Sequence, residues 1–162
     1  MLHSAETLNK KIEETIKNIL FDLKPASLYE PMRYVLSHGG KRVRPLMTLL
    51  ATNLFSGSIE ESLKPAIGIE IFHNSTLVHD DLIDNSDMRR GKPAVHKKWD
   101  ANTAILSGQA MQIESFKYMA SVPSDLLPQV MELFSTTAME VCRGQQLDLD
   151  FEKREDVSES EY

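Results

Sequence analysis

The spacing of the apolar residues is the feature that most limits which fold this chain can adopt. Apolar residues recur with the helical period of about 3.6 residues. Over residues 5–23 they form one apolar stripe, made of Leu8, Ile12, Ile16, Ile19, Leu20 and Leu23. Only 7 Gly and 7 Pro interrupt the 162 residues. The alternation of apolar and polar residues that is typical of strands is essentially absent. The pattern therefore predicts an all-α fold, one helical bundle.

Further helices are expected wherever the same period recurs. A short helix over 29–36 should end before Gly39 and Gly40, and Pro45 should start a helix over 46–54 that ends near Gly57. A long helix over 62–86, apolar on most sides, is followed by a loop over 89–93. Two further helices are predicted over 101–120 and 126–149, separated by a helix stop and cap at 122–125. The polar, acidic tail over 152–162 is interpreted as the start of a longer loop.

Composition narrows the class of protein. The chain is long enough for one domain, and its 41% hydrophobic and 26% charged residues are ordinary for a globular protein. A net charge of −6 argues against a nucleic-acid binder. The single Cys142 excludes an internal disulfide and fits a reducing compartment. No apolar run reaches the roughly 18 residues of a membrane span, and no signal-peptide core is present, so we expect a cytoplasmic protein without stable membrane insertion.

Residues 80–90 carry the clearest chemical signal. Asp80 and Asp84 are four residues apart, so on a helix they share a face, with Asp81 beside them. Oxygen ligands on one face suit Mg²⁺, which binds through one or two carboxylates plus substrate phosphates. Arg89 and Arg90 follow with forked donors that match phosphate oxygens. The run therefore predicts a site that binds a diphosphate through a metal ion. The simpler alternative for such a motif is a solvated helix end.

A second cationic segment occupies residues 38–45, with the sequence His-Gly-Gly-Lys-Arg-Val-Arg-Pro. Its two glycines allow close backbone approach, and its three cations precede a helix start at Pro45, where anions bind favourably. A helix end followed by solvated basic residues fits the segment alone about equally well. Together with the carboxylate run, phosphate binding is the favoured interpretation.

Polar residues inside apolar helices are further candidates. His73 lies seven residues before Asp80, on the same face, which favours a polar lining role over that of a core histidine. His79 is off that face and is interpreted as structural. Because buried polar groups are costly unless they are satisfied, Gln145 and Asp148 should face a polar cavity. A helix emerging into solvent fits their spacing nearly as well.

Taken together, these motifs resemble the trans-isoprenyl diphosphate synthases, the polyprenyl synthetase family. The matching residues are 40–45, 73–93 and 144–145 with Asp148, in the family's order and spacing, and the similarity covers nearly the whole chain. The resemblance implies an isoprenoid synthase-type bundle around a central cavity, of which residues 1–162 would be the N-terminal part of a single domain. It also implies a homodimer.

The same resemblance assigns roles to residues. It implies Mg²⁺ as the cofactor, isopentenyl diphosphate and an allylic diphosphate as substrates, and catalysis through Asp80, Asp84 and Arg89. Asp80, Asp81 and Asp84 would bind the metal, and Arg89 would contact the allylic diphosphate. The residues expected to bind the isopentenyl diphosphate are Lys41, Arg44, His73 and Arg90, while Gln145 and Asp148 would line the second wall of the cavity.

Product length follows from a further feature of the family. Members that make short products tend to carry bulky aromatics four or five residues before the first aspartate. Here these positions are Thr76 and Ser75, both small, with Phe72 as a deeper floor. We therefore expect a prenyltransferase with an all-trans product of geranylgeranyl length or longer.

Two departures from the family pattern leave an alternative open. Members of the family carry a second aspartate-rich motif, whereas this chain has one, so the fold is expected to be incomplete and the chain alone inactive. Gly108-Gln109 stands where the family has Gly-Asp. The alternative is a naturally short, non-catalytic partner subunit. A metal-binding helical bundle would need Glu-x-x-His pairs on facing helices, which the sequence does not supply.

Overall fold

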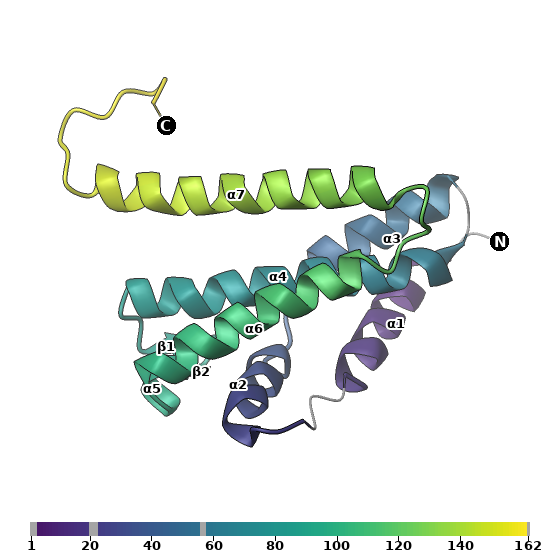
Figure 1. The fold of residues 1–162 in the computed structure, drawn as a ribbon, viewed down its shortest axis with the longest axis horizontal. Helices are drawn as coiled ribbons and strands as arrows, with labels where there is room; N and C mark the ends of the chain where they lie inside the picture. The colour runs from purple at the N-terminus through teal and green to yellow at the C-terminus, as the bar shows by residue number, and fades with distance from the viewer. Residues whose placement is uncertain (1–2, 20–22, 56–57, 162) are drawn as a thin grey trace. The chain divides into compact units, whose positions relative to one another are not determined.

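The structure is a computed structural model that describes residues 3–19, 23–55 and 58–161. It confirms the all-α prediction (Figure 1). The elements are α1 (Ala5–Lys17), α2 (Ala26–Leu36), α3 (Val43–Phe55), α4 (Ile59–Ile83), β1 (Met88–Arg89), β2 (Lys92–Pro93), α5 (Val95–Lys98), α6 (Ala101–Met119) and α7 (Leu127–Phe151). They form two compact units, Met1–Pro123 and Ser124–Tyr162, and each is described by itself. That both belong to one domain stays a prediction.

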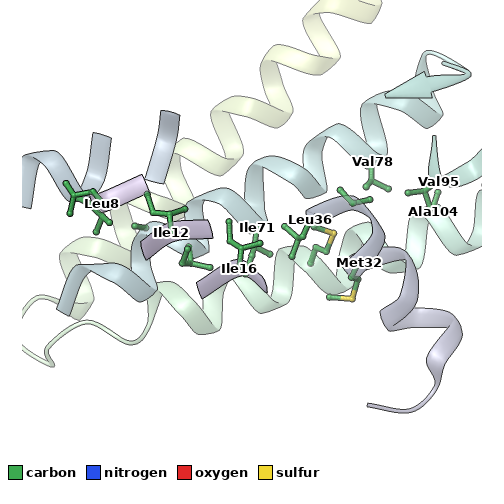
Figure 2. Close-up of a cluster of buried hydrophobic side chains, with 14 of the residues drawn as sticks. Leu8, Ile12, Ile16, Met32, Leu36, Ile71, Val78, Val95 and Ala104 are labelled. Atoms are coloured by element: carbon green, nitrogen blue, oxygen red, sulfur yellow. The ribbon is translucent and has the colours of Figure 1, made fainter. Parts of the chain in front are cut away.

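Helix α4 is the centre of the first unit. It contacts α1, α2, α3, α5 and α6, and it packs along α6 (Figure 1). Side chains from all of these elements form one apolar core around it, each worth about 1.5–3 kcal/mol when fully buried. The core residues labelled in Figure 2 are Leu8, Ile12, Ile16, Met32, Leu36, Ile71, Val78, Val95 and Ala104.

Helix α1 is shorter than the predicted 5–23. It starts after Ser4, whose side chain accepts from the backbone N–H of Thr7, and it ends at Lys17 with Asn18 as the C-cap. Asparagine favours helix ends because its side chain competes for backbone hydrogen bonds. Consequently Leu23 is 60% exposed and does not join the stripe. The prediction for Leu20 falls outside the described residues.

The next two helices begin earlier than predicted. Helix α2 starts at Ala26, directly after Pro25, and ends at Leu36, as expected from the glycines that follow. Helix α3 starts at Val43, so that Pro45 lies inside its first turn, where the missing N–H costs nothing. The predicted end at Gly57 lies outside the described residues.

Helix α4 ends at Ile83, before the predicted residue 86. Asn85 adopts φ 51°, its N–H donates to Leu82 O at 3.3 Å, and the N–H of Ser86 donates to Asp81 O at 2.9 Å. This is a Schellman motif, in which a left-handed residue satisfies the last carbonyls of a helix. The motif leaves Asp84 as the C-cap and turns the chain back toward α4.

Residues 89–93 were predicted to be a loop, but they contain a small antiparallel hairpin. Met88 pairs with Pro93, and Arg89 pairs with Lys92. Arg90 (φ 52°) and Gly91 (φ 76°) form the turn, which matches the left-handed pair that two-residue hairpins favour. The pattern of alternation missed it because each strand has only two residues.

The C-terminal part follows the prediction with two exceptions. Helix α6 closely matches the predicted 101–120, but the short helix α5 was not predicted. Helix α7 has Leu126 at its N-cap without a side-chain hydrogen bond, so the cap expected at 122–125 is wrong. Residues 152–161 contain turns but no further helix. Among the described helices, none combines the length and the apolar character needed to cross a bilayer.

Candidate functional site

The hairpin folds Arg89 back onto the carboxylates at the end of α4. The Nε of Arg89 donates to Asp81 Oδ1 at 2.9 Å. Its Nη2 donates to Asp81 Oδ1 at 2.5 Å and to Asp80 Oδ2 at 3.0 Å. One guanidinium thus bridges two neighbouring carboxylates, and the structure brings together three of the predicted site residues.

These two carboxylates differ in how deeply they are buried. The Asp81 side chain is 6% exposed, whereas that of Asp80 is 29% exposed. The hydrogen bond to Asp81 is the main reason why the pKa of Arg89 is raised, although partial burial acts against it. Asp81 is therefore an interior partner of Arg89, and Asp80 stays partly accessible to a ligand.

Asp84 is exposed at the C-cap of α4. Its backbone N–H donates to Asp80 O at 2.9 Å, so one helical turn separates the two residues and they share a face. Within the described ranges, no three His, Cys, Asp or Glu side chains are grouped closely enough to hold a metal ion. Two carboxylates on one face nevertheless fit Mg²⁺, which takes further ligands from water and phosphate. Metal binding by Asp80, Asp81 and Asp84 together stays a prediction.

Arg90 joins the hairpin to the glycine turn, defined here as Gly39 and Gly40. Its Nη1 donates to the carbonyl oxygen of Gly39. A Cβ at Gly40 would lie 3.1 Å from Arg90 Cζ, and Gly40 also adopts φ 140°, so glycine is required there. Burial and then the charge of Arg42 lower the pKa of Arg90, which still remains protonated. The two cationic segments predicted from the sequence are therefore in contact.

His73 is half-buried on α4, two turns before the first carboxylate. Burial lowers its pKa, and the charge of Arg44 lowers it further, while Glu70 acts in the opposite direction. Arg90 and Arg89 add smaller effects that also lower it. His73 is thus neutral at pH 7 and lies within electrostatic range of three predicted phosphate-binding arginines.

The remaining predicted residues fall into two groups. Lys41 and Arg44 are exposed on either side of the buried Arg42, and Arg44 lies in the first turn of α3, where unpaired N–H groups attract anions. Gln145 and Asp148 lie on α7, in the second unit. Because that unit is described by itself, their place on a cavity wall stays a prediction.

A buried polar network beneath this site was missed by the sequence analysis. Arg42 and Glu70 are each 3% exposed and Asn74 is 1% exposed. Arg42 Nη1 donates to Glu70 Oε1 at 2.7 Å, and Asn74 Nδ2 donates to the same oxygen at 3.0 Å. The available signal was a glutamate inside an otherwise apolar span, because a buried charge persists only when it is paired.

His38 was also not identified as a site residue. Its Nε2 and Asn74 Oδ1 are buried without a hydrogen-bond partner in the described chain, and both residues line a small pocket beside Arg89. The ring of Tyr34 meets that of His38 edge-on, with centroids 4.2 Å apart. Burial, followed by the charge of Lys92, lowers the pKa of His38 to about 4. The imidazole is therefore neutral at pH 7.

His79 was interpreted as structural, and in the structure its ring packs on α6. Its ring lies against Gly108 of α6, where a Cβ would overlap it, and its Nε2 is 3.4 Å from Ile105 O. Gly108 thus allows α4 and α6 to approach each other. Gln109, which stands at the position where an aspartate was expected, is exposed.

The family model described as polyprenyl synthetase matches residues 25–162. The chain is 39% identical over 164 residues to a geranylgeranyl diphosphate synthase of Methanosarcina mazei, covering 100% of this chain and 51% of that protein. It is 37% identical over 169 residues to a geranylfarnesyl diphosphate synthase of Natronomonas pharaonis, covering 93% of this chain and 50% of that protein.

A solved structure supports the same comparison. The geranylgeranyl pyrophosphate synthetase from the archaeon Geoglobus acetivorans matches with a TM-score of 0.93 at 36% identity, covering 98% of this chain and 52% of that one. The chain therefore has the fold of isoprenoid synthases and spans about half the length of the relatives it matches.

Proposed function

The chain belongs to the polyprenyl synthetase family, and from this premise we propose that it carries the first diphosphate-binding part of a trans-prenyltransferase. The enzyme would condense isopentenyl diphosphate with an allylic diphosphate into an all-trans product of geranylgeranyl length or longer. The observation that carries the proposal is the hairpin whose two arginines bind the α4 carboxylates and the glycine turn. A non-catalytic partner subunit is not supported, because the relatives named above are synthases.

The carboxylate end of α4 would serve the allylic diphosphate. Asp80 and Asp84 would hold Mg²⁺, which as a Lewis acid offsets the charge that develops on a departing diphosphate. Arg89 would bind the same diphosphate. Because the buried Asp81 already orients Arg89, that guanidinium loses little freedom on binding. We therefore assign Asp81 to the orientation of Arg89 in place of the metal binding expected from the resemblance.

The cations around the glycine turn would serve the isopentenyl diphosphate. Neutral His73 offers one hydrogen bond, and Arg90 offers a fork that matches phosphate oxygens. A dry, shaped site then protects the reacting allylic cation from water. The residues assigned to this substrate are Lys41, Arg44, His73 and Arg90, and those assigned to the second wall are Gln145 and Asp148.

Several parts of the proposal concern the whole protein. Residues 1–162 contain one of the two aspartate-rich motifs expected in the family, so we propose that they turn over little or no substrate alone. The homodimer and the cytoplasmic location are carried over from the resemblance and from composition, and they stay predictions.

Titration calorimetry on the 162-residue chain tests the proposed binding of Mg²⁺ and diphosphate. Mg²⁺ alone should bind weakly, and inorganic diphosphate should strengthen its binding, since each supplies ligands that the other lacks. Asp80→Ala should abolish this gain. Asp87→Ala is the matched control, because Asp87 lies three residues after Asp84, its side chain is 81% exposed and it pairs with Lys97 instead.

Two results would contradict the proposal. One is tight Mg²⁺ binding in the absence of diphosphate, which would require a closed cage of protein ligands. The other is an Asp80→Ala variant that keeps the full gain from diphosphate, since the metal would then lie elsewhere.

A further inference from the structure

Arg42 differs from the two cations beside it. Lys41 and Arg44 are exposed, whereas the Arg42 side chain is 1% exposed. Its φ of 47° lies in the left-handed region, which a residue with a Cβ rarely adopts. Its carbonyl also accepts from the N–H of Leu46 at 3.1 Å, at the start of α3. The conformation of Arg42 therefore sets the direction in which α3 leaves the glycine turn.

Three hydrogen bonds hold Arg42 to three different helices. Nε donates to Glu13 Oε1 of α1 at 2.8 Å and Nη1 donates to Glu70 Oε1 of α4 at 2.7 Å. Nη2 donates to Leu36 O, at the end of α2, at 2.8 Å. Burial acts to lower the pKa of Arg42, but its bonds with Glu70 and Glu13 outweigh burial and raise it. Only a planar fork reaches all three acceptors at once.

Glu70 is the buried partner in this arrangement. It is 3% exposed, and Asn74 Nδ2 donates both to its carbonyl oxygen at 2.8 Å and to its carboxylate. The charges of Arg42 and Arg90 oppose each other, and that of Glu70 favours Arg90 in its protonated form. A single buried carboxylate thus reduces the repulsion between the cationic segments above it.

We propose that Arg42 is the positioning residue of the glycine–cation loop, defined as residues 39–44, and that Glu70 holds it in place. The buried guanidinium fixes the backbone, and the backbone fixes where Lys41 and Arg44 project. These exposed cations are then preorganised for a diphosphate that Arg42 itself does not touch, which reduces the entropy lost on binding. The ligand in this inference rests on the proposed function, whereas the order of the loop rests on geometry alone.

Hydrogen exchange over residues 39–46 and calorimetry with inorganic diphosphate and Mg²⁺ test this proposal on the 162-residue chain. Arg42→Lys keeps the charge without the fork, and Glu70→Gln keeps the shape without the charge. Both should speed exchange in the loop and weaken diphosphate binding on the order of tenfold, the value of a charge-assisted hydrogen bond. Exchange in the loop should speed up by a larger factor than exchange in the centre of α4.

Glu13→Gln is the matched control, because Glu13 bonds to the same guanidinium from a site that is 35% exposed. Because solvent partly screens Glu13 and Glu70 still neutralises Arg42 in this variant, both readouts should change by less than about threefold. A purely structural ion pair would lower global stability without a selective change in loop exchange.

Unchanged loop exchange and unchanged affinity in the folded Arg42→Lys and Glu70→Gln variants would overturn the proposal. So would complete unfolding of both variants by circular dichroism, since the pair would then hold the whole fold rather than one loop. If the unsubstituted chain binds no diphosphate, the proposed function fails. Loop exchange still decides in that case whether Arg42 orders residues 39–44.

Discussion

The two polar sides of α4 are built differently. The buried side comprises Glu70, Asn74 and Asp81, and the accessible side comprises His73, Thr76, Asp80 and Asp84. Arginines from neighbouring segments already occupy both carboxylates of the buried side. On the accessible side, Asp80 and Asp84 retain surface that a ligand can reach. One helix thus separates the groups that hold the site together from those proposed to bind the reactants.

The largest expected effect comes from the accessible side. In a protein that contains the complete catalytic domain, Asp80→Ala should lower kcat for condensation by about a hundredfold or more, because a metal ligand and a partner of Arg89 are lost. The unfolding midpoint should barely change, since Asp80 is 29% exposed. Steady-state kinetics and thermal unfolding measure the two quantities. Near-normal turnover would remove Asp80 from the site.

The buried side should respond in the opposite way, through stability. Glu70→Gln should lower the free energy of unfolding by about 3 kcal/mol, the lower end for removing one partner of a buried pair, because Glu13 still faces Arg42. Asp81→Asn should cost about 1 kcal/mol, since Arg89 is 33% exposed and solvent screens the pair. Urea denaturation gives both values. If Asp81→Asn lowered the free energy of unfolding more than Glu70→Gln does, the Asp81–Arg89 pair and not the Glu70–Arg42 pair would be the stronger one.

Sequence reasoning succeeded where the structure depends on local spacing. The apolar period predicted the helices, and the spacing of Asp80 and Asp84 predicted their common face. It failed at the ends of α1 and α4, where Asn18 and Asn85 stop a periodic pattern. Single residues of this kind outweigh a stripe that continues past them.

Long-range pairing explains the remaining misses. Arg42 and Glu70 are 28 residues apart, and nothing in either segment alone distinguishes a buried arginine from the exposed cations beside it. The same holds for Asp81, which sequence spacing groups with the metal ligands. Asp81 pairs with Arg89 only because the hairpin brings Arg89 back to the end of α4.

A smaller effect concerns the pH dependence of stability. The pKa of His38 is lowered to about 4 from its ordinary value of 6.5, so between these values the unfolded chain takes up a proton that the folded chain does not. Stability is then fully present above about pH 6.5 and falls toward pH 4. His73 acts in the same direction through a smaller shift.

His38→Gln should therefore flatten the loss of stability between pH 7 and pH 4.5 more than His73→Gln does. Urea denaturation at the two pH values measures the slopes. An equal slope in the His38→Gln variant and the unsubstituted chain would show that the environment of His38 does not favour the neutral ring.

The finest comparison is between two neighbours on α4 that differ in burial. Ser75 is 0% exposed and its Oγ donates to Phe72 O at 2.6 Å. It is seven residues after Gly68 and four before His79, and both of these pack against α6, so Ser75 faces α6 as well. Thr76 is half-buried, four residues before Asp80. From the sequence, both small residues were expected to line the cavity at the same depth. In the structure Ser75 is fully buried and Thr76 is not.

Thr76→Phe should therefore shorten the product of the complete enzyme, because a ring there occupies the space that the growing tail needs, and it should leave stability nearly unchanged. Ser75→Phe should instead lower the free energy of unfolding by about 1–3 kcal/mol, because the packing of α4 on α6 leaves no room for a ring. Thr76→Val, similar in size to threonine, is the control and should keep the product length. Chromatography of the products and urea denaturation measure the two outcomes. A Ser75→Phe variant with a shorter product and full stability would place Ser75 on the cavity wall, and the proposed difference between Ser75 and Thr76 would then be wrong.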